Sequence, residues 1–273
     1  LVRNYNTNVY EKTNINELIF SSYPNITKGG FYNNYEFIIK NSNTDTQKSS
    51  NYKKNENFYA SGLFQYNASL PLINESKDYQ KILKPKLSLK LAPKHTKDQR
   101  GEYSRIDVNN IYSLSRVTNN DSIEGGMSFI FGNDFSIYNK KESREVFNLK
   151  LANNVRVEEN DDLPQNNQID QKTSNLFSEI LFSPNEILST TYKSSIKNNL
   201  SETSYENLIT EFQVNNFVTT FDYLNENNTL AKNSYLTNKT TYSANKFNSF
   251  SFSTRKNKKT NLTEYYNLMY QYK

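Results

Sequence analysis

The sequence predicts an all-β protein, part of a transmembrane β-barrel whose antiparallel strands run up and down in chain order. Three observations predict it: apolar and polar side chains alternate along successive segments, tight turns alternate with longer polar loops, and a polar composition includes many aromatic residues. Successive side chains of a strand point to opposite faces, so the alternation gives each strand one apolar and one polar face. A barrel in a membrane needs both, because lipid covers its outside while its lumen is polar.

The alternation is clearest in two segments. Every second residue from Phe58 to Leu72 is apolar or glycine. Between residues 83 and 91, four leucines and a proline alternate with three lysines and a serine. Each segment is therefore expected to form a strand with one face for lipid or a core and one for water.

The composition is compatible with such a barrel. Mean hydropathy is −0.85 and only 35% of the 273 residues are hydrophobic, which is low for a globular domain with an ordinary core. A barrel tolerates this because only one face of each strand meets lipid. Disorder would also lower the hydropathy, but 21 Tyr and 17 Phe, many at alternate positions, argue against it. A transmembrane helix is excluded because no apolar run reaches the required length of about 18 residues.

The turns and loops follow in a regular order. Tight turns are expected at residues 25–30, 74–79, 139–143, 183–185, 215–216 and 244–246. Longer polar loops are expected at residues 42–56, 94–120, 155–172, 198–204, 225–233 and 256–261. Outer-membrane barrels have short periplasmic turns and longer external loops, so the tight turns are predicted to face the periplasm. The pattern gives about twelve or thirteen strands of roughly ten residues, part of a larger barrel.

The same alternation assigns side chains to the two faces of the later strands. The residues expected to face lipid are Leu208, Phe212, Val214, Phe217, Phe221, Tyr223, Phe250, Phe252, Leu268 and Tyr270. Those expected to face the lumen are Lys84, Lys86, Lys90, Lys193, Glu211, Asp222 and Lys239. The core of a soluble β-sandwich would also alternate. Successive hairpins without a helix, and strands longer than the usual five or six residues, favour the barrel.

Several chemistries are excluded by composition. The chain has no Cys and one His, so it offers no thiol nucleophile, zinc cluster or disulfide framework. His95 lies in a polar stretch and is interpreted as a solvated loop residue. No glycine-rich phosphate loop is present, and the net charge of +5 is spread without a basic stripe. We therefore expect no enzymatic activity, no metal or other cofactor, and no nucleic-acid partner.

One segment is more specific than the repeating strands. Residues 105–129 carry Asp107, Asn110, Arg116, Asp121, Glu124 and Gly126 in an order that resembles a barrel segment of the LptD family. These are the outer-membrane lipopolysaccharide-assembly proteins once called organic solvent tolerance proteins (OstA). The Leu-x-Pro-x-Leu run at residues 83–87 and the Tyr-Pro-Asn at residues 23–25 also fit that family. The chain departs from it where Asn119 or Asn120 replaces the usual Gly and Ser122 the usual Arg.

The resemblance implies a translocon and not an enzyme. Lipopolysaccharide would arrive over a periplasmic bridge protein of the LptA type and be inserted into the outer leaflet of a Gram-negative outer membrane. A plug lipoprotein of the LptE type would occupy the lumen, and outer-membrane lipid would surround the barrel. The lysines at positions 84, 86 and 90 share one face and are expected to attract sugar phosphates. Arg116 is expected to pair with Asp121 or Glu124, which would order an external loop against the barrel mouth or plug.

The resemblance also bears on domain organisation. Residues 1–273 are expected to be a fragment of a single outer-membrane barrel domain holding its mid-to-late strands. The family's N-terminal periplasmic domain and last strands would then lie outside it, as would most of the gap between first and last strands through which lipid leaves.

Two other functions remain open. A general porin or receptor-type barrel would show a charged loop folded inside or an N-terminal plug, and the sequence gives no sign of either. A soluble all-β surface or adhesion protein would need anchoring signals in flanking sequence.

Overall fold

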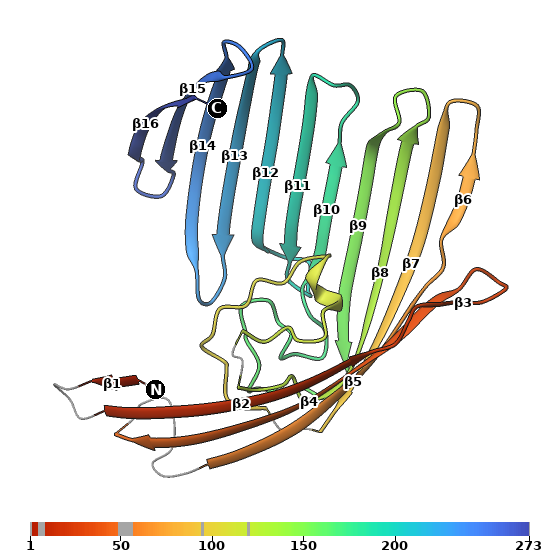
Figure 1. Ribbon diagram of the computed structural model, residues 1–273, viewed down its shortest axis with the longest axis vertical. Coiled ribbons are helices and arrows are strands. Elements are labelled where there is room, and N and C mark those ends of the chain that lie inside the picture. The colour runs from red at the N-terminus through yellow and green to blue at the C-terminus, as the bar shows by residue number, and fades with distance from the viewer. Residues whose placement is uncertain (1, 5–8, 49–56, 94–95, 119–120, 273) are drawn as a thin grey trace.

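The computed structural model describes residues 2–4, 9–48, 57–93, 96–118 and 121–272, which form one antiparallel sheet of sixteen strands (Figure 1). The strands are β1 (Val2–Asn4), β2 (Val9–Ser21), β3 (Asn25–Ile26), β4 (Tyr32–Gln47), β5 (Asn57–Ser69), β6 (Leu72–Glu75), β7 (Tyr79–Ala92), β8 (Gly126–Asn139), β9 (Arg144–Arg156), β10 (Leu176–Phe182), β11 (Leu188–Ile196), β12 (Thr203–Val214), β13 (Phe217–Asn227), β14 (Lys232–Ser243), β15 (Asn248–Asn257) and β16 (Leu262–Tyr272). A single 3₁₀ turn, η1 (Asn110–Tyr112), is the one helical element of the described residues. Within that part of the chain, no helix has the length and apolar character needed to cross a membrane.

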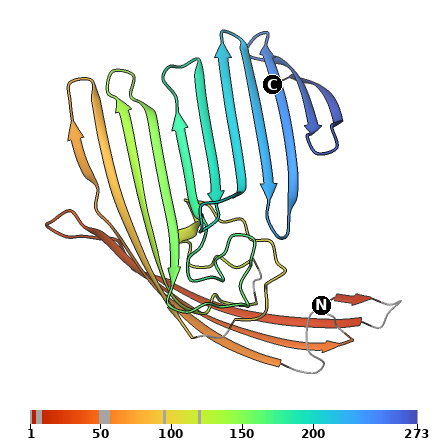
Figure 2. The ribbon, with the colours of Figure 1, turned by 180° about the vertical axis from the view of Figure 1, so that it is seen from behind.

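The strand order follows the chain, which confirms the predicted all-β, up-and-down class. Apart from β3 and β6, each strand from β1 to β16 pairs with the next one in chain order, while β3 and β6 are short and pair with β4 and β7. The order holds fourteen strands in the described residues, one of them the three-residue β1, so the expected twelve or thirteen is close. The sheet curves strongly without closing, and β1 and β16 are its two edges (Figure 2).

Tight turns and longer loops alternate as the sequence predicts as far as β12, but not beyond it. Short turns join β8 to β9, β10 to β11, β12 to β13 and β14 to β15, all at one end of the sheet (Figure 1). At the other end, residues 93–125 between β7 and β8 and residues 157–175 between β9 and β10 form much longer connections. The long loops expected at residues 225–233 and 256–261 were wrong, because β13 and β15 extend into them and leave turns of four residues, 228–231 and 258–261. The assignment of the short turns to the periplasm stays a prediction.

The sheet has an inside-out distribution of side chains, which means that apolar side chains are exposed on one face and polar side chains are buried on the other. Its convex face exposes large apolar residues: Phe131 is 51% exposed and Phe221 43%. Its concave face buries polar ones, since Gln65 is 0% and Ser88 0% exposed. The register puts the apolar residues in continuous rows across the convex face, such as Ile180, Tyr192, Leu208, Tyr223 and Leu236. A water-soluble protein buries such a surface, so this face requires apolar surroundings.

Two prolines lie at the one interruption along β5, β6 and β7. Pro71 separates β5 from β6, and Pro85 lies opposite this break on β7. A proline has no N–H to donate, so it is tolerated where ladder hydrogen bonds are already missing. Here the N–H of Leu70 still reaches the Pro85 carbonyl oxygen, at 3.2 Å, and keeps the strands together.

An apolar core forms between the concave face and the two long loops, not between two sheets. Its members come from β8, β9, β10 and both loops, and they are Ile106, Val108, Ile111, Val117, Ile130, Ala152, Leu163, Ile169 and Phe177. Tyr112 packs against this cluster. The loops are therefore held on the sheet by burial of apolar side chains as well as by polar contacts.

Gly132 on β8 is required by this packing. A Cβ at Gly132 would lie 1.8 Å from the Tyr112 hydroxyl oxygen and 2.8 Å from the Leu151 carbonyl oxygen. We expect Gly132→Ala to displace Tyr112 and to lower the free energy of unfolding by about 1–3 kcal/mol, as overpacking does. Urea unfolding in detergent measures this. Gly101→Ala is the matched control, because nothing lies within 4 Å of a Cβ there; equal stability of the two variants would contradict the expectation.

Candidate functional site

The connection between β7 and β8 folds across the concave face of the sheet (Figure 1). We call its described residues 96–118 and 121–125 the plug loop. On the β5 side, Gln65 Nε2 donates to the Tyr112 carbonyl oxygen at 2.6 Å. On the far side, the Tyr103 hydroxyl donates to Glu226 Oε1 of β13 at 2.6 Å, and the Arg105 guanidinium lies 4.2 Å from the ring centre of Tyr205 on β12. The plug loop therefore bridges strands that are far apart in the sheet.

Glu124 is the centre of a buried ionic cluster that anchors the plug loop. Arg116 Nε donates to Glu124 Oε2 at 2.7 Å, and its Nη2 donates to Oε1 of the same carboxylate. Arg156 Nη1, from the end of β9, donates to Glu124 Oε1 at 2.8 Å. Lys90 Nζ of β7 lies 3.8 Å from Glu124 Oε2. All four side chains are at most 2% exposed, so one carboxylate holds three cations away from water.

The cluster has an electrostatic consequence for Glu124. Burial by itself would raise the pKa of this carboxyl group, because the charged form loses its hydration. The opposing charges of Arg116, Lys90 and Arg156, with the Arg116 hydrogen bonds, outweigh burial and hold the pKa of Glu124 well below its usual range. The carboxylate therefore stays ionised over the whole physiological pH range.

The cations of the cluster have further partners that fix the loop backbone. Lys90 Nζ donates to the carbonyl oxygens of Ser113, at 2.5 Å, and Leu114, at 3.3 Å. Arg116 Nη1 donates to Asn154 Oδ1 at 3.0 Å, and Arg156 Nη2 donates to the Gly125 carbonyl oxygen. Each cation thus joins a strand of the sheet to the loop.

The start of the plug loop is tied to its end. Lys97 Nζ lies 2.8 Å from Asp121 Oδ2, and the Lys97 backbone N–H donates to Ser122 Oγ at 3.0 Å. Gly126 follows with a φ of +93°, in the left-handed region that favours glycine, and a Cβ there would lie 2.7 Å from Arg156 Nη2. Only glycine therefore lets β8 begin this close to the cluster.

Asp107 and Asn110 form a local turn that starts η1. Asp107 Oδ1 accepts from the backbone N–H of Asn109, at 2.8 Å, and of Asn110, at 3.0 Å. In return Asn110 Oδ1 accepts from the Asp107 N–H at 2.8 Å. Such side-chain hydrogen bonds replace those that a turn cannot make within its backbone. This turn aims Ile111 and Tyr112 at the apolar cluster.

The second long loop, residues 157–175, packs against the plug loop. Asn166 Nδ2 and Asn167 Nδ2 both donate to the Ser104 carbonyl oxygen, at 2.8 and 2.7 Å. Asn160 Nδ2 donates to Thr96 Oγ1 at 3.0 Å. Its Asp170 is buried, and burial raises the pKa of that carboxyl group. The two loops therefore form one unit on the concave face.

The seven residues expected to face the lumen share the concave face, as the strand register shows. Cations and anions alternate in one row of the register across the five strands from β7 to β11. The row consists of Lys84, Asp134, Lys150, Glu179 and Lys193. Lys86 pairs with Asp134, and Lys84 Nζ lies 5.9 Å from the ring centre of Tyr32. Lys90 differs from the others because the plug loop buries it.

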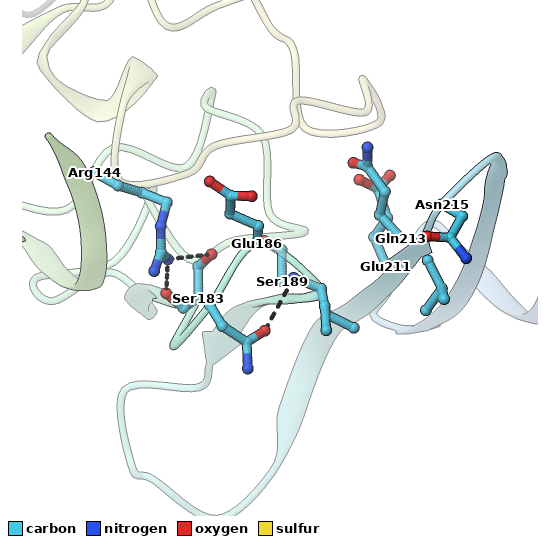
Figure 3. A pocket seen from close by; sticks show the side chains of 10 residues that line it. Arg144, Ser183, Glu186, Ser189, Glu211, Gln213 and Asn215 are labelled. Carbon is cyan, nitrogen blue, oxygen red and sulfur yellow. Dashed lines mark hydrogen bonds between the residues drawn. The ribbon is translucent and has the colours of Figure 1, made fainter. Parts of the chain in front are cut away.

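The remaining candidates lie on strands that the plug loop leaves largely uncovered. Asp222 accepts from Asn207 Nδ2 at 2.5 Å, while Glu211 and Lys239 flank Thr220 in the register. Glu211 lines a polar pocket of about 540 Å³ at the short-turn end of β9 to β13. Arg144 is hydrogen-bonded to Ser183 at one side of this pocket, and Glu211 and Gln213 lie at the other (Figure 3).

The sequence predicted some of the ion-pair partners in this site, but not all of them. Of the two partners proposed for Arg116, the structure pairs it with Glu124, and Asp121 pairs with Lys97. Arg156 and Asn154 were missed, because they lie some thirty residues further along the chain. His95, Asn119 and Asn120 lie outside the described residues. In the described ranges no group of three or more His, Cys, Asp or Glu residues is placed to hold a metal ion.

One expectation was wrong: the sequence suggested no charged loop folded inside, and the plug loop is one. The apolar residues at positions 106, 108 and 111, spaced along a polar segment, are the signal that was overlooked. A porin eyelet presents its charges to a water-filled pore. Here the charges of Arg116 and Glu124 are buried and satisfied by each other, so the loop is built as an anchored plug.

Comparison with known proteins places these features in a family. No individual curated protein matches the chain. A family model described as LPS transport system D, LptD, matches residues 22–261, which include the plug loop, its ionic cluster and every strand from β3 to β15. With that match over most of its length, the chain belongs to the LptD family, and a role in lipopolysaccharide transport to the outer membrane follows.

Proposed function

We propose that this chain forms part of a translocon that inserts lipopolysaccharide into the outer leaflet of a Gram-negative outer membrane. The family supports the transport role. The observation that carries the proposal is the inside-out sheet, whose convex face is apolar while its concave face is polar and charged. Such a wall suits a molecule with a polar, phosphorylated saccharide on one side and lipid on the other.

The family and the two faces of the sheet together support the proposed partners. Lipopolysaccharide is the substrate, and bilayer lipid covers the convex face. A plug lipoprotein of the LptE type is proposed to occupy the concave surface of β11 to β16, where Glu211 and Lys239 remain exposed. A bridge protein of the LptA type would deliver the substrate. The charged side chains of Lys193, Glu211, Asp222 and Lys239 on this part of the concave face support a polar partner there.

Lys84 is proposed to contact substrate phosphate. Its neighbour Lys86 forms an ion pair with Asp134. Lys84 instead contacts the Tyr32 ring, and among the described residues it forms no ion pair. Both lysines line a pocket of about 240 Å³ between β7 and the plug loop. An ammonium group without a carboxylate partner remains available to a phosphate.

Depletion of the parent gene in its own bacterium tests the function. Surface lipopolysaccharide should fall while the outer membrane becomes leakier to small hydrophobic dyes. Complementation with the Lys84→Glu variant should restore less surface lipopolysaccharide than Lys28→Glu, a matched change in an exposed turn. A porin would give the opposite result, with normal surface lipopolysaccharide and reduced solute uptake, and that outcome would reject the proposal.

A further inference from the structure

Among the described strands, β5 and β7 part over half of the length of β5. β5 pairs with β4 along almost its whole length, but it pairs with β7 only from Phe64 to Ser69. On the β7 side this ladder ends at Leu91, and Pro93 follows the end of β7. From residue 57 to residue 63, β5 therefore has no neighbour on that edge among the described strands.

A groove of about 420 Å³ opens on the convex face where the strands part. Its lining contains only apolar residues, namely Phe37, Gly62, Phe64, Leu91, Ala92 and Pro93. The register aligns Phe37, Phe64 and Leu91 in one row across three strands. Beside that row, a Cβ at Gly62 would lie 3.3 Å from the Ile38 carbonyl oxygen and 3.7 Å from the Phe37 ring, so the missing side chain helps to make the hollow.

The groove is closed toward the concave face. Behind it, the buried side chains of Ile38 and Leu63 pack with Ile123 of the plug loop, and Ala92 and Leu114 complete this cluster. An occupant therefore enters from the convex side. The row that forms the groove wall continues into the apolar surface of that face, through Phe20 on one side and Met127 on the other.

We propose that this groove holds one acyl chain of a lipid of the surrounding bilayer. The inference rests on the part of the proposed function that places the convex face in lipid. An apolar hollow offers water no hydrogen-bond partner, whereas a hydrocarbon chain gains dispersion contacts with the aromatic walls. The closed floor distinguishes this site from the open, flat surface elsewhere on the convex face, so its lipid exchanges more slowly than its neighbours.

Fluorescence quenching tests the proposal, because the sequence contains no Trp. Phe64→Trp puts the sole indole in the groove, and Phe221→Trp puts it on the convex face outside the groove. The full chain is reconstituted in phosphatidylcholine vesicles, and phosphatidylcholine with brominated acyl chains is then exchanged in. We expect both indoles to be quenched at equilibrium, with Phe64→Trp quenched roughly tenfold more slowly, which corresponds to a barrier to lipid exchange that is higher by about 1.4 kcal/mol.

A second part of the experiment fills the groove with an added side chain. Gly62→Ala in the Phe64→Trp background should remove most of the delay, whereas Gly101→Ala should leave it unchanged. Equal quenching rates at the two indoles would overturn the proposal, and so would a Phe64→Trp indole that is never quenched, because protein and not lipid would then fill the groove. An unquenched Phe221→Trp would instead reject the membrane placement of the whole convex face.

Discussion

Replacing Glu124 with glutamine is expected to release the plug loop from the concave face. Glutamine preserves the shape of the side chain but removes the carboxylate that contacts the Arg116, Arg156 and Lys90 head groups. Breaking a buried ion pair by removing one partner typically costs about 3–5 kcal/mol, because the remaining charge stays desolvated. Amide hydrogen exchange in residues 96–118 and 121–125 should therefore speed up by roughly a hundredfold to a few thousandfold.

Two variants separate this effect from a general loss of charge. Glu102→Gln removes an exposed carboxylate from the same plug loop and should leave exchange unchanged. Adding Lys90→Met to Glu124→Gln removes one of the stranded cations and should restore part of the protection. Wild-type protection in Glu124→Gln itself would show that the apolar cluster alone holds the loop.

An arginine on the convex face is expected to prevent insertion into a bilayer. Phe221 lies near the middle of β13 and is 43% exposed on the apolar side. Arginine at the midplane of a barrel's lipid face costs about 2–4 kcal/mol, which corresponds to roughly a 30-fold to nearly thousandfold loss in the insertion equilibrium. The change in gel mobility between heated and unheated samples, after refolding into vesicles, measures the inserted fraction of Phe221→Arg.

The adjacent residue provides the control for this substitution. Thr220 lies on the concave face, and its Oγ1 is 3.4 Å from Glu211 Oε2. Thr220→Arg therefore places the same charge beside a carboxylate, and insertion should be close to wild type. If both arginines reduced insertion equally, or if only Thr220→Arg did, the assignment of the two faces would be reversed or wrong.

Local pattern explains why the strands and turns were predictable. The alternation at residues 83–91 and the turn at Asn215, where φ is +51°, depend on neighbours in sequence, and both agree with the structure. The pairing of Arg116 with Glu124 was within reach for the same reason, since eight residues separate them.

The interior position of the plug loop was not predictable in this way. It depends on Lys90 and Arg156, which belong to different strands, and on Tyr103 meeting Glu226, 123 residues further along. Such distant partners satisfy the polar and charged groups of the loop where it lies against the sheet. The position of the plug loop was therefore not predicted because its partners are distant in the sequence, and not because of their residue types.

The Glu124 cluster also makes the anchoring of the plug loop depend on the correct register of β7, β8 and β9 during assembly. Arg156 ends β9, Lys90 nearly ends β7, and β8 between them begins two residues after Glu124. A slip of β9 by one residue would send the Arg156 side chain to the convex face, because neighbouring positions of a strand face opposite ways. Glu124 would then lose one cation and the plug loop one anchor. A misaligned intermediate would thus keep its plug loop accessible to proteases and chaperones, and only the correctly aligned wall would conceal it.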